Sequence, residues 1–215
     1  MAWLSRWGVF APAPVDGAVD AAYFAARHRE ARQPLIVSGC HRENRKAVEL
    51  FCRAAVIFGA AELNLAFHWC GPLAGAGAAR LKAAGIGTAP APDGATLASR
   101  LESAWVYFAC GGDAQFPVQL AQAMACGLPC LAADVPAYRG VVEDGVTGLL
   151  YRSEQEALQL LTMLIDERAL RQRLGEAARH AALQRFSRQR PRPDPGGSNP
   201  RAAPGAIPVP ARSER

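Results

Sequence analysis

The sequence predicts an α/β protein built on a doubly wound, Rossmann-like parallel sheet. Short apolar runs alternate along the chain with segments whose apolar residues recur at helical spacing. Connections between the two kinds of segment are short, and glycine follows several of the apolar runs. Strands that alternate with helices in this way pair in parallel through crossover helices. The 215 residues are enough for one such domain with additional segments.

The first predicted elements are two strand–helix pairs. PLIVSG, at 34–39, is an apolar run that ends in glycine, as a buried parallel strand does. Residues 44–59 carry apolar side chains at helical spacing. LNLAFHW, at 63–69, is predicted as the second strand, and the alanine-rich segment 76–85 as the second helix.

The next elements surround the segment GGDAQFPVQLAQAMACGLPC. Residues 96–104 are expected to form a helix and the apolar run 105–110 a strand. Residues 118–126 then form a short helix that ends before Gly127. Pro117 suits the first helical position, because its missing N–H is not needed there.

The last elements continue the alternation. CLAAD (130–134) and GLLY (148–151) are predicted strands. Residues 153–167 form a helix that begins with a capping box, in which serine is followed three residues later by glutamate. Residues 168–186 form an amphipathic helix with a polar face.

The expected domain spans 34–186, preceded by a linker-like segment, 1–33, and followed by a tail, 187–215. The tail is rich in Pro, Gly, Ser and Arg and has few large apolar residues, so we expect it to be disordered. Its six arginines face one Asp and one Glu, and this balance of +4 supplies most of the net charge of +5. The body is therefore close to neutral, and no nucleic-acid-binding face is expected, although a tail that tethers the chain to nucleic acid or a membrane is an alternative.

Membrane insertion and metal binding are both disfavoured. No apolar run approaches the roughly 20 residues of a transmembrane helix, and the N-terminus does not resemble a signal peptide. The expected location is the cytoplasm, or the periphery of the inner membrane. The six cysteines form no CxxC pair and mostly lie in apolar runs, which favours structural free thiols over metal ligands. His68, within an apolar strand, is expected to be a core histidine.

Cations follow the first predicted strand. Gly39 lets the chain turn, and Arg42, Arg45 and Lys46 lie at or just before the start of a helix. In a doubly wound sheet, ligands bind beyond the carboxyl ends of the strands, where the strand order reverses. Cations beside free helix amides would hold a phosphate or diphosphate there. The alternative is an ordinary solvated helix start with scattered charges.

Two further loops end predicted strands at the same edge. Gly111 and Gly112 follow the strand 105–110 and would let backbone approach a ligand, and the helix 118–126 would point its positive end at the same space. The loop HWCGPLAGAG after the second strand lacks the GxGxxG register of a dinucleotide site. We expect that loop to serve the packing of helix against strand.

QAMACGLPCLAAD, followed by VVEDGVTGLLY and RLGEAARHAALQRFS, resembles the C-terminal half of retaining GT-B glycosyltransferases of the group 1 (family 4) class. The likeness is weaker before residue 100. There VDGAVDAAYFA, at 15–25, is similar to the interdomain linker of that class, and PLIVSG with the later Arg-Lys pair is similar to its first strand and basic loop. The resemblance covers residues 10–187 approximately.

The resemblance implies a single GT-B half-domain that holds a nucleotide-diphosphate sugar as the donor substrate, with no separate cofactor and no metal. In this class a second domain binds the acceptor. The residues before the first predicted strand are too few for such a domain, so the acceptor domain is expected to come from another chain.

Departures from the family pattern bear on activity. That pattern has two glutamates separated by seven residues, and they fall at Ala114 and Gln122. Gln122 keeps one acceptor oxygen for a nucleotide ribose, whereas Ala114 can neither carry charge nor accept a hydrogen bond. A further family acid falls at Gly140, and Asp113 replaces the first glutamate only if the loop shifts register. Two hypotheses therefore stay open: a donor domain for retaining glycosyl transfer, and an inactive or truncated glycosyltransferase-like scaffold.

Overall fold

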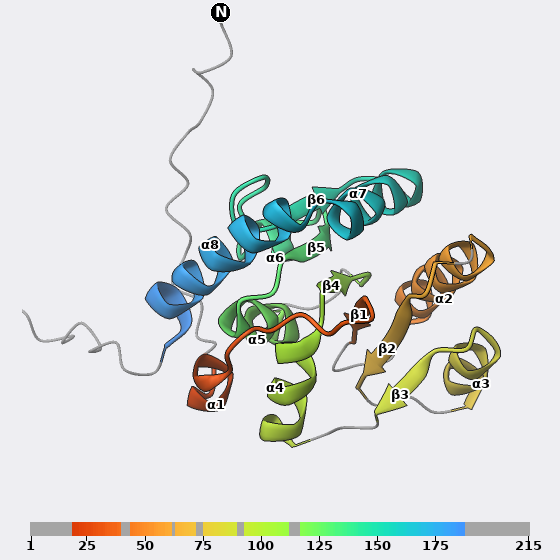
Figure 1. Cartoon of the computed structure of the whole chain (residues 1–215), viewed down its shortest axis with the longest axis horizontal. Coiled ribbons are helices and arrows are strands. Elements are labelled where there is room, and N and C mark those ends of the chain that lie inside the picture. Colours follow the sequence, from red (N-terminus) through yellow and green to blue (C-terminus); the bar gives the residue numbers. More distant parts are fainter. Residues whose placement is uncertain are drawn as a thin grey trace, which may run out of the picture.

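The computed structural model describes residues 19–39, 44–61, 63–71, 75–89, 93–111 and 117–187. Within them, six strands form one parallel sheet (Figure 1). The strands are β1 Leu35–Ser38, β2 Ala66–Cys70, β3 Gly87–Ala89, β4 Val106–Ala109, β5 Cys130–Ala133 and β6 Leu149–Tyr151. The helices are α1 Ala21–Ala25, α2 Arg45–Ala60, α3 Gly75–Ala83, α4 Gly94–Ser103, α5 Val118–Cys126, α6 Pro136–Arg139, α7 Glu154–Asp166 and α8 Arg168–Phe186.

The strands lie in the order β3-β2-β1-β4-β5-β6. The chain adds β2 and β3 on one side of β1 and then returns to add β4, β5 and β6 on the other. The strand order therefore reverses between β1 and β4, where a doubly wound sheet binds its ligand. This topology confirms the predicted doubly wound, Rossmann-like fold. β3 was not predicted, because its residues, Gly87, Thr88 and Ala89, include no large apolar side chain that would mark a buried strand.

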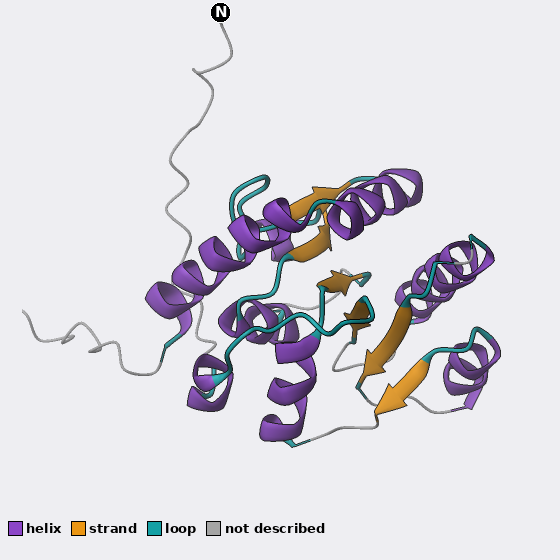
Figure 2. Cartoon of the chain, viewed as in Figure 1, coloured by secondary structure: helices purple, strands orange, loops and turns teal. Residues whose placement is uncertain are grey.

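Helices cover both faces of the sheet (Figure 2). On one face α2, α3 and α7 pack around buried Phe51, Trp69 and Phe108. On the other face α1, α4, α5 and α8 pack around residues such as Leu120 and Met124, which are almost fully buried. In the described part of the chain, no helix combines the length and apolar character needed to cross a membrane.

Two helix starts differ slightly from the prediction. Pro117 is the N-cap of α5 and not its first helical residue, while Gly127 ends the helix in the left-handed conformation, with φ of 85°, as expected of a glycine C-cap. At the start of α7 the Ser153 hydroxyl accepts from the Glu156 amide at 3.1 Å. The Glu156 carboxylate accepts from the amide of Arg152 at 2.7 Å. The predicted capping box is therefore formed with its return bond displaced by one residue.

Residues 19–33, here named the N-terminal strap, lie against the domain. The Val19 amide donates to the Phe186 carbonyl at 3.0 Å, so the start of the strap lies beside the end of α8. Further along, the Trp105 indole donates to the Ala31 carbonyl at 2.8 Å. The division of the chain at residues 33 and 187 stays a prediction, and the tail beyond Ser187 lies outside the described residues.

Candidate functional site

The candidate site lies where β1 and β4 end and α2 and α5 begin. The helix amides at the start of α2 have no partner within the helix, and the helix dipole makes this end positive. The Asn44 side chain caps the helix by accepting from the Ala47 amide at 3.1 Å. Arg42, Gly112 and Ala114, which were predicted for this site, lie outside the described residues.

The two cations on the first turn of α2, Arg45 and Lys46, differ in their charged partners. Arg45 is exposed, and its guanidinium pairs with Glu49 at 2.8 Å. Glu49 also binds Arg80 at 2.5 Å, and hydrogen bonds from Arg45 and Arg80 hold the pKa of this carboxyl below its usual range. Lys46 is exposed and has no hydrogen bond or ion pair with any described residue. Lys46 therefore presents the less compensated positive charge at this helix start.

Gly111 lies directly against the first turn of α2. A Cβ at this position would come within 3.3 Å of the Asn44 Nδ2 atom and 3.4 Å of the Ala47 Cβ atom. The loop after β4 therefore passes close to the helix end that carries Lys46. A larger residue at 111 would push the loop away or push the start of α2 aside. The structure thus places Gly111 against Asn44 and Ala47, the residues on either side of Arg45 and Lys46.

Gly39 occupies a tighter place at the end of β1. A Cβ there would overlap the carbonyl oxygen of Cys70 and lie 2.8 Å from the Gln119 Oε1 atom. The Tyr107 hydroxyl donates to the Gly39 carbonyl at 3.3 Å. Glycine is therefore required at 39 by the close approach of neighbouring strands, whether or not a ligand is present.

Gln119 is a buried residue of this site that the sequence analysis did not single out. Its Nε2 atom donates to the Cys70 carbonyl at 3.1 Å, and its Oε1 atom lies 3.4 Å from the Tyr107 hydroxyl. These bonds tie the first turn of α5 to the ends of β2 and β4. The signal in the sequence was a glutamine within a helix that is otherwise mostly apolar.

Gln122 lies on the side of α5 that faces α1. Burial raises the pKa of the Tyr23 hydroxyl, and a hydrogen bond from the Gln122 side chain opposes that rise. The Oε1 atom of Gln122 is buried and has no hydrogen-bond partner. No hydrogen bond in the described part of the chain joins Gln122 to Gly39, Gly111 or the start of α2. The residue aligned with the family's second glutamate therefore lies beside Tyr23 of the N-terminal strap.

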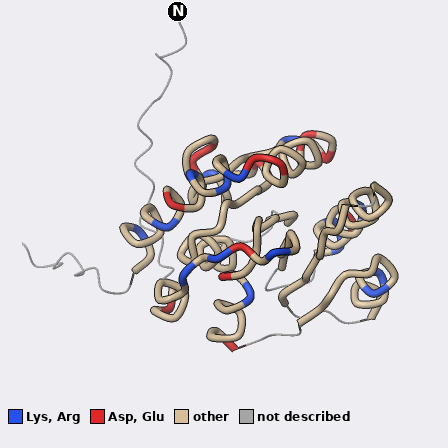
Figure 3. The backbone as a smooth tube through the Cα atoms, viewed as in Figure 1, with Lys and Arg blue, Asp and Glu red and all other residues tan. Residues whose placement is uncertain are grey.

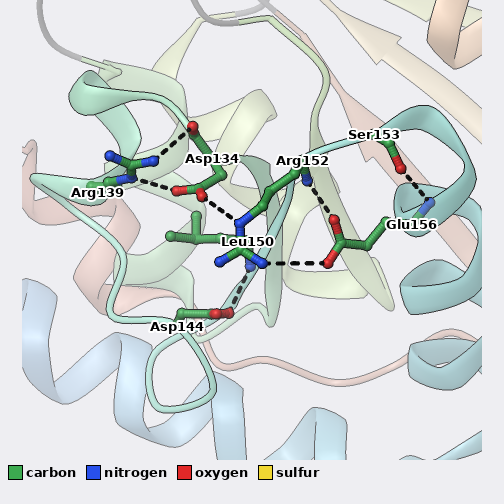
Figure 4. Close-up of polar contacts among 7 residues, drawn as sticks. All are labelled: Asp134, Arg139, Asp144, Leu150, Arg152, Ser153 and Glu156. Carbon is green, nitrogen blue, oxygen red and sulfur yellow. Dashed lines mark hydrogen bonds and ion pairs between the residues drawn. The ribbon is translucent and has the colours of Figure 1, made fainter. Parts of the chain in front are cut away.

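An ionic cluster lies at the carboxyl ends of β5 and β6 (Figure 4). Asp134 follows β5, and its two carboxylate oxygens accept from the Nε atoms of Arg139 at 2.5 Å and Arg152 at 3.0 Å. The hydrogen bond from Arg139 is the main cause that holds the pKa of Asp134 below its ordinary value. Gly140, where the family has an acid, follows Arg139 directly. Asp134 is therefore occupied and ionised, which makes it a poor proton acceptor.

The described cysteines behave as structural thiols. Cys52, Cys70, Cys110, Cys126 and Cys130 are free, as predicted, and Cys40 lies outside the described residues. Burial raises the pKa of Cys70 to about 11 and that of Cys126 to about 12, so neither is an activated nucleophile. Among the described residues, no three His, Cys, Asp or Glu side chains gather as a metal site would require.

His68 is half-buried, with Nδ1 at 3.3 Å from an Nη atom of Arg100. Burial and the neighbouring guanidinium lower its pKa. His68 therefore has a partner within the fold, as expected of a core histidine.

The second half of the domain matches a known protein family in sequence. Residues 90–181, less than half of the chain, match the family model described as Glycosyl transferases group 1. No curated protein matches the chain in sequence.

Solved structures with this fold are distantly related in sequence. The C-terminal domain of the group 1 glycosyl transferase LpcC from Francisella tularensis is 18% identical, with a TM-score of 0.65, and the match covers 80% of this chain and 100% of that domain. Anabaena HepE, in complex with UDP and glucose, is 16% identical, with a TM-score of 0.63 and coverage of 73% of this chain and 45% of HepE. Sucrose-phosphate synthase from Thermosynechococcus elongatus is 20% identical, with a TM-score of 0.60 and coverage of 80% of this chain and 46% of the synthase.

These similarities define the fold as that of a GT-B half-domain. The chain spans about half the length of HepE and of the synthase.

Proposed function

We propose that this chain is the donor-binding domain of a group 1 glycosyltransferase and that it binds a nucleotide-diphosphate sugar at the carboxyl edge of its sheet. The observation that carries the proposal is the approach of Gly111 to the first turn of α2, beside Lys46, which has no partner among the described residues. This approach lies where the strand order reverses. The match to the group 1 family model and the UDP complex of HepE support the same ligand class.

Each residue has a proposed role. The first-turn amides of α2, with Lys46 and Arg45, would hold the diphosphate, since cations and free helix amides both favour bound anions. Gly39 and Gly111 would keep the backbone close to the ligand. Gln122 would reach the ribose only after its hydrogen bond to Tyr23 is given up. For Arg42 and Gly112, which lie outside the described residues, the proposed roles are to bind the diphosphate and to let the loop approach it.

Transfer itself needs more than this domain. The chemistry requires stabilisation of a leaving diphosphate and of an oxocarbenium-like sugar, together with an acceptor hydroxyl. We propose that an acceptor-binding domain outside the described residues completes the site, that the transfer retains the anomeric configuration, and that the protein works in the cytoplasm. The nucleotide sugar is the substrate, and no additional cofactor or metal is invoked.

The second candidate function is a non-catalytic scaffold that keeps the fold and has lost the chemistry. Ala114 and Gln122 replace the two family glutamates, and Gly140 replaces a third acid. Asp134, a described carboxylate that precedes this third position in sequence, is bound by two arginines. These substitutions favour binding without turnover in this chain.

Calorimetric titration of the full chain with UDP, GDP and ADP tests donor binding. We expect heat with at least one nucleotide, and we expect the double variant Arg45→Glu/Lys46→Glu to weaken that affinity by more than about tenfold, because charge-assisted contacts to phosphate are strong. Lys82→Glu, an equally exposed charge reversal at the end of α3, is the control and should leave affinity unchanged.

The two candidates differ in turnover. If nucleotide binds and the corresponding nucleotide sugar is hydrolysed no faster than in buffer, the scaffold function is favoured. If hydrolysis appears after Ala114→Glu and Gln122→Glu are combined, the lost carboxylates explain the inactivity. Absence of heat with all three nucleotides at millimolar concentration would exclude the donor-binding proposal.

A further inference from the structure

We propose that a pocket at the amino-terminal edge of the sheet binds a small phosphorylated sugar, at a place separate from the proposed donor site. The pocket has a volume of about 280 Å³ and lies between the N-terminal strap, the end of α5 and α8. Gly127 of its wall connects α5 to the start of β5, and His28 of its wall binds the carbonyl of Ala104, just before β4. Both strands begin at this edge, so it is opposite the edge that carries Gly111 and Lys46.

Two glycines form the wall of the pocket where α5 and α8 cross. Gly175 of α8 lies so close to Gly127 that a Cβ at 175 would overlap the Gly127 carbonyl oxygen. Gly127 itself adopts φ of 85°, which favours glycine. Because neither residue carries a side chain, the backbones of α5 and α8 come into close contact, and this contact forms one side of the pocket.

Two arginines and one glutamate line the pocket, so its wall carries a net positive charge. The Arg179 guanidinium donates to the carbonyls of Ala26 at 3.0 Å and Ala125 at 2.7 Å, and to the carbonyl of Phe24. These partners are neutral, so they orient the guanidinium without forming an ion pair with it. Arg27 also lines the pocket, is exposed, and its side chain has no partner among the described residues. Two cations therefore face one hollow, a combination that favours an anion.

The pocket also offers groups that suit hydroxyls. His28 binds the Ala104 carbonyl through Nε2 at 2.7 Å, so this nitrogen carries the proton and Nδ1 is left for a ligand. From α8, the side chains of Gln172 and Glu176 are exposed and line the same space. Glu176 can only accept while ionised, and Gln172 can donate and accept. An anion that carries several hydroxyl groups uses both kinds of lining, whereas a bare anion is repelled by Glu176.

The surroundings of the pocket strengthen the preference for an anion. Residues 26–33 and 167–187 together contain eight arginines and three glutamates, a balance of +5. The other described residues contain eight Lys or Arg and ten Asp or Glu, a balance of −2. Figure 3 shows the basic positions along α8 and along the segment that leads to β1. The local field therefore attracts anions to this edge of the molecule.

The size of the pocket limits the ligand. Pockets that enclose drug-sized ligands have volumes of roughly 300–1,000 Å³, so this one, at about 280 Å³, lies just below that range. A hexose phosphate is small enough for such a space, and a nucleotide sugar is too large to be enclosed by it. A phosphorylated monosaccharide therefore satisfies the charge, the hydroxyl partners and the volume together.

Calorimetry of the full chain with glucose 6-phosphate, inorganic phosphate and glucose tests this proposal. We expect glucose 6-phosphate to bind in the millimolar range or tighter, inorganic phosphate to bind more weakly, and glucose to give no heat. Arg27→Glu should weaken the binding of glucose 6-phosphate by at least about tenfold, because it reverses a charge in the wall. Glu176→Gln should reduce the preference for glucose 6-phosphate over phosphate.

Two control variants separate this pocket from other effects of charge. Arg173→Glu reverses an exposed charge on α8 outside the pocket, and Lys46→Glu reverses one at the proposed donor site. Both should leave glucose 6-phosphate binding unchanged, and all variants should keep the melting temperature of the wild type. Three results would overturn the proposal: no heat with glucose 6-phosphate, phosphate binding as tight as that of glucose 6-phosphate, or equal losses in Arg27→Glu and Arg173→Glu.

Discussion

Where the strand order reverses, the carboxyl edge of the sheet is held by a different kind of bond from the amino edge. Asp134 binds two arginines after β5 and β6, but uncharged side chains bind the ends of β1, β2 and β4. Gln119 holds the Cys70 carbonyl, Tyr107 holds that of Gly39, and the Tyr151 hydroxyl donates to Ala109 at 3.4 Å. The cations of the first turn of α2 take no part in these bonds. This part of the edge therefore keeps Lys46 available while neutral groups fix the ends of β1, β2 and β4.

At the amino edge and along α8, arginine side chains make the bonds that hold neighbouring segments together. Arg171 and Arg179 of α8 bind groups in the N-terminal strap, and Arg185 binds the carbonyls of Val141, at 3.1 Å, and Gly140. The same residue type is therefore structural on α8 and exposed at the start of α2. Counting basic residues does not distinguish the two uses, whereas burial and partners do.

The largest effect is expected from the buried arginine of α8. Arg171 is 1% exposed and makes a bidentate pair with Glu30, at 2.7 and 3.1 Å, while another nitrogen donates to the carbonyls of Leu164 and Ile165. Its guanidinium also lies 3.9 Å from the Trp105 ring centre. Arg171→Met should lower the free energy of unfolding by about 3–5 kcal/mol, because Glu30 loses its buried partner. Urea denaturation measures this loss.

The matched control is Arg173→Met, an exposed arginine two residues away on the same helix, which should change stability by less than about 0.5 kcal/mol. Combining Arg171→Met with Glu30→Leu should recover part of the loss, since no uncompensated charge then remains. If the two arginine substitutions lowered the free energy of unfolding equally, Arg171 would not hold the strap through Glu30.

The next effect concerns the crossing of α5 and α8. Gly175→Ala places a Cβ against the backbone carbonyl of Gly127, which cannot move as a flexible side chain can. We expect a loss of about 1–3 kcal/mol in urea denaturation, the range found for overpacking. Gly59→Ala, in α2, is the control, because nothing lies within 4 Å of its Cβ, and it should stabilise the protein by about 0.5–1 kcal/mol. If Gly175→Ala stabilised the protein as Gly59→Ala does, α5 and α8 would not cross as closely as described.

A smaller effect is expected at the carboxyl edge. Gln119→Met keeps the length of the side chain and removes the bond to the Cys70 carbonyl. One lost bond of this kind costs about 0.5–1.5 kcal/mol. The exposed Gln159→Met on α7 is the control for the change in side-chain chemistry. If Gln119→Met costs as much as Arg171→Met, the two edges do not differ in the way proposed.

Sequence patterns predicted most of the fold because periodicity reports local burial. The alternation of strands and helices gave the sheet, and Gly127 marked the end of α5. Patterns could not report contacts between distant segments. The ribose role of Gln122 came from its place along the chain and stays a prediction, whereas its neighbour Tyr23 of α1 lies about a hundred residues earlier. Asp134 was missed for the same reason, since Arg152 reaches it from the end of β6.

The smallest effect is a pH dependence of the free energy of unfolding, and its sign follows from the lowered pKa of His68. Burial, and next the Arg100 guanidinium, lower the pKa of His68 in the folded protein below the ordinary 6.5. Above pH 6.5 both states are neutral at this residue, and stability does not depend on it. As the pH falls through 6.5, the unfolded state takes up the proton first, so the free energy of unfolding falls until the folded pKa is reached.

His68→Gln should remove this part of the acid destabilisation, so the difference in unfolding free energy between pH 8 and pH 5 should be smaller in the variant than in the wild type. His180→Gln, on the exposed side of α8, is the control, and it should leave that difference unchanged. An identical pH dependence in wild type and His68→Gln would mean that His68 takes up protons equally in both states. The contact with Arg100, which joins β2 to α4, would then be too weak in solution to set the charge of the imidazole.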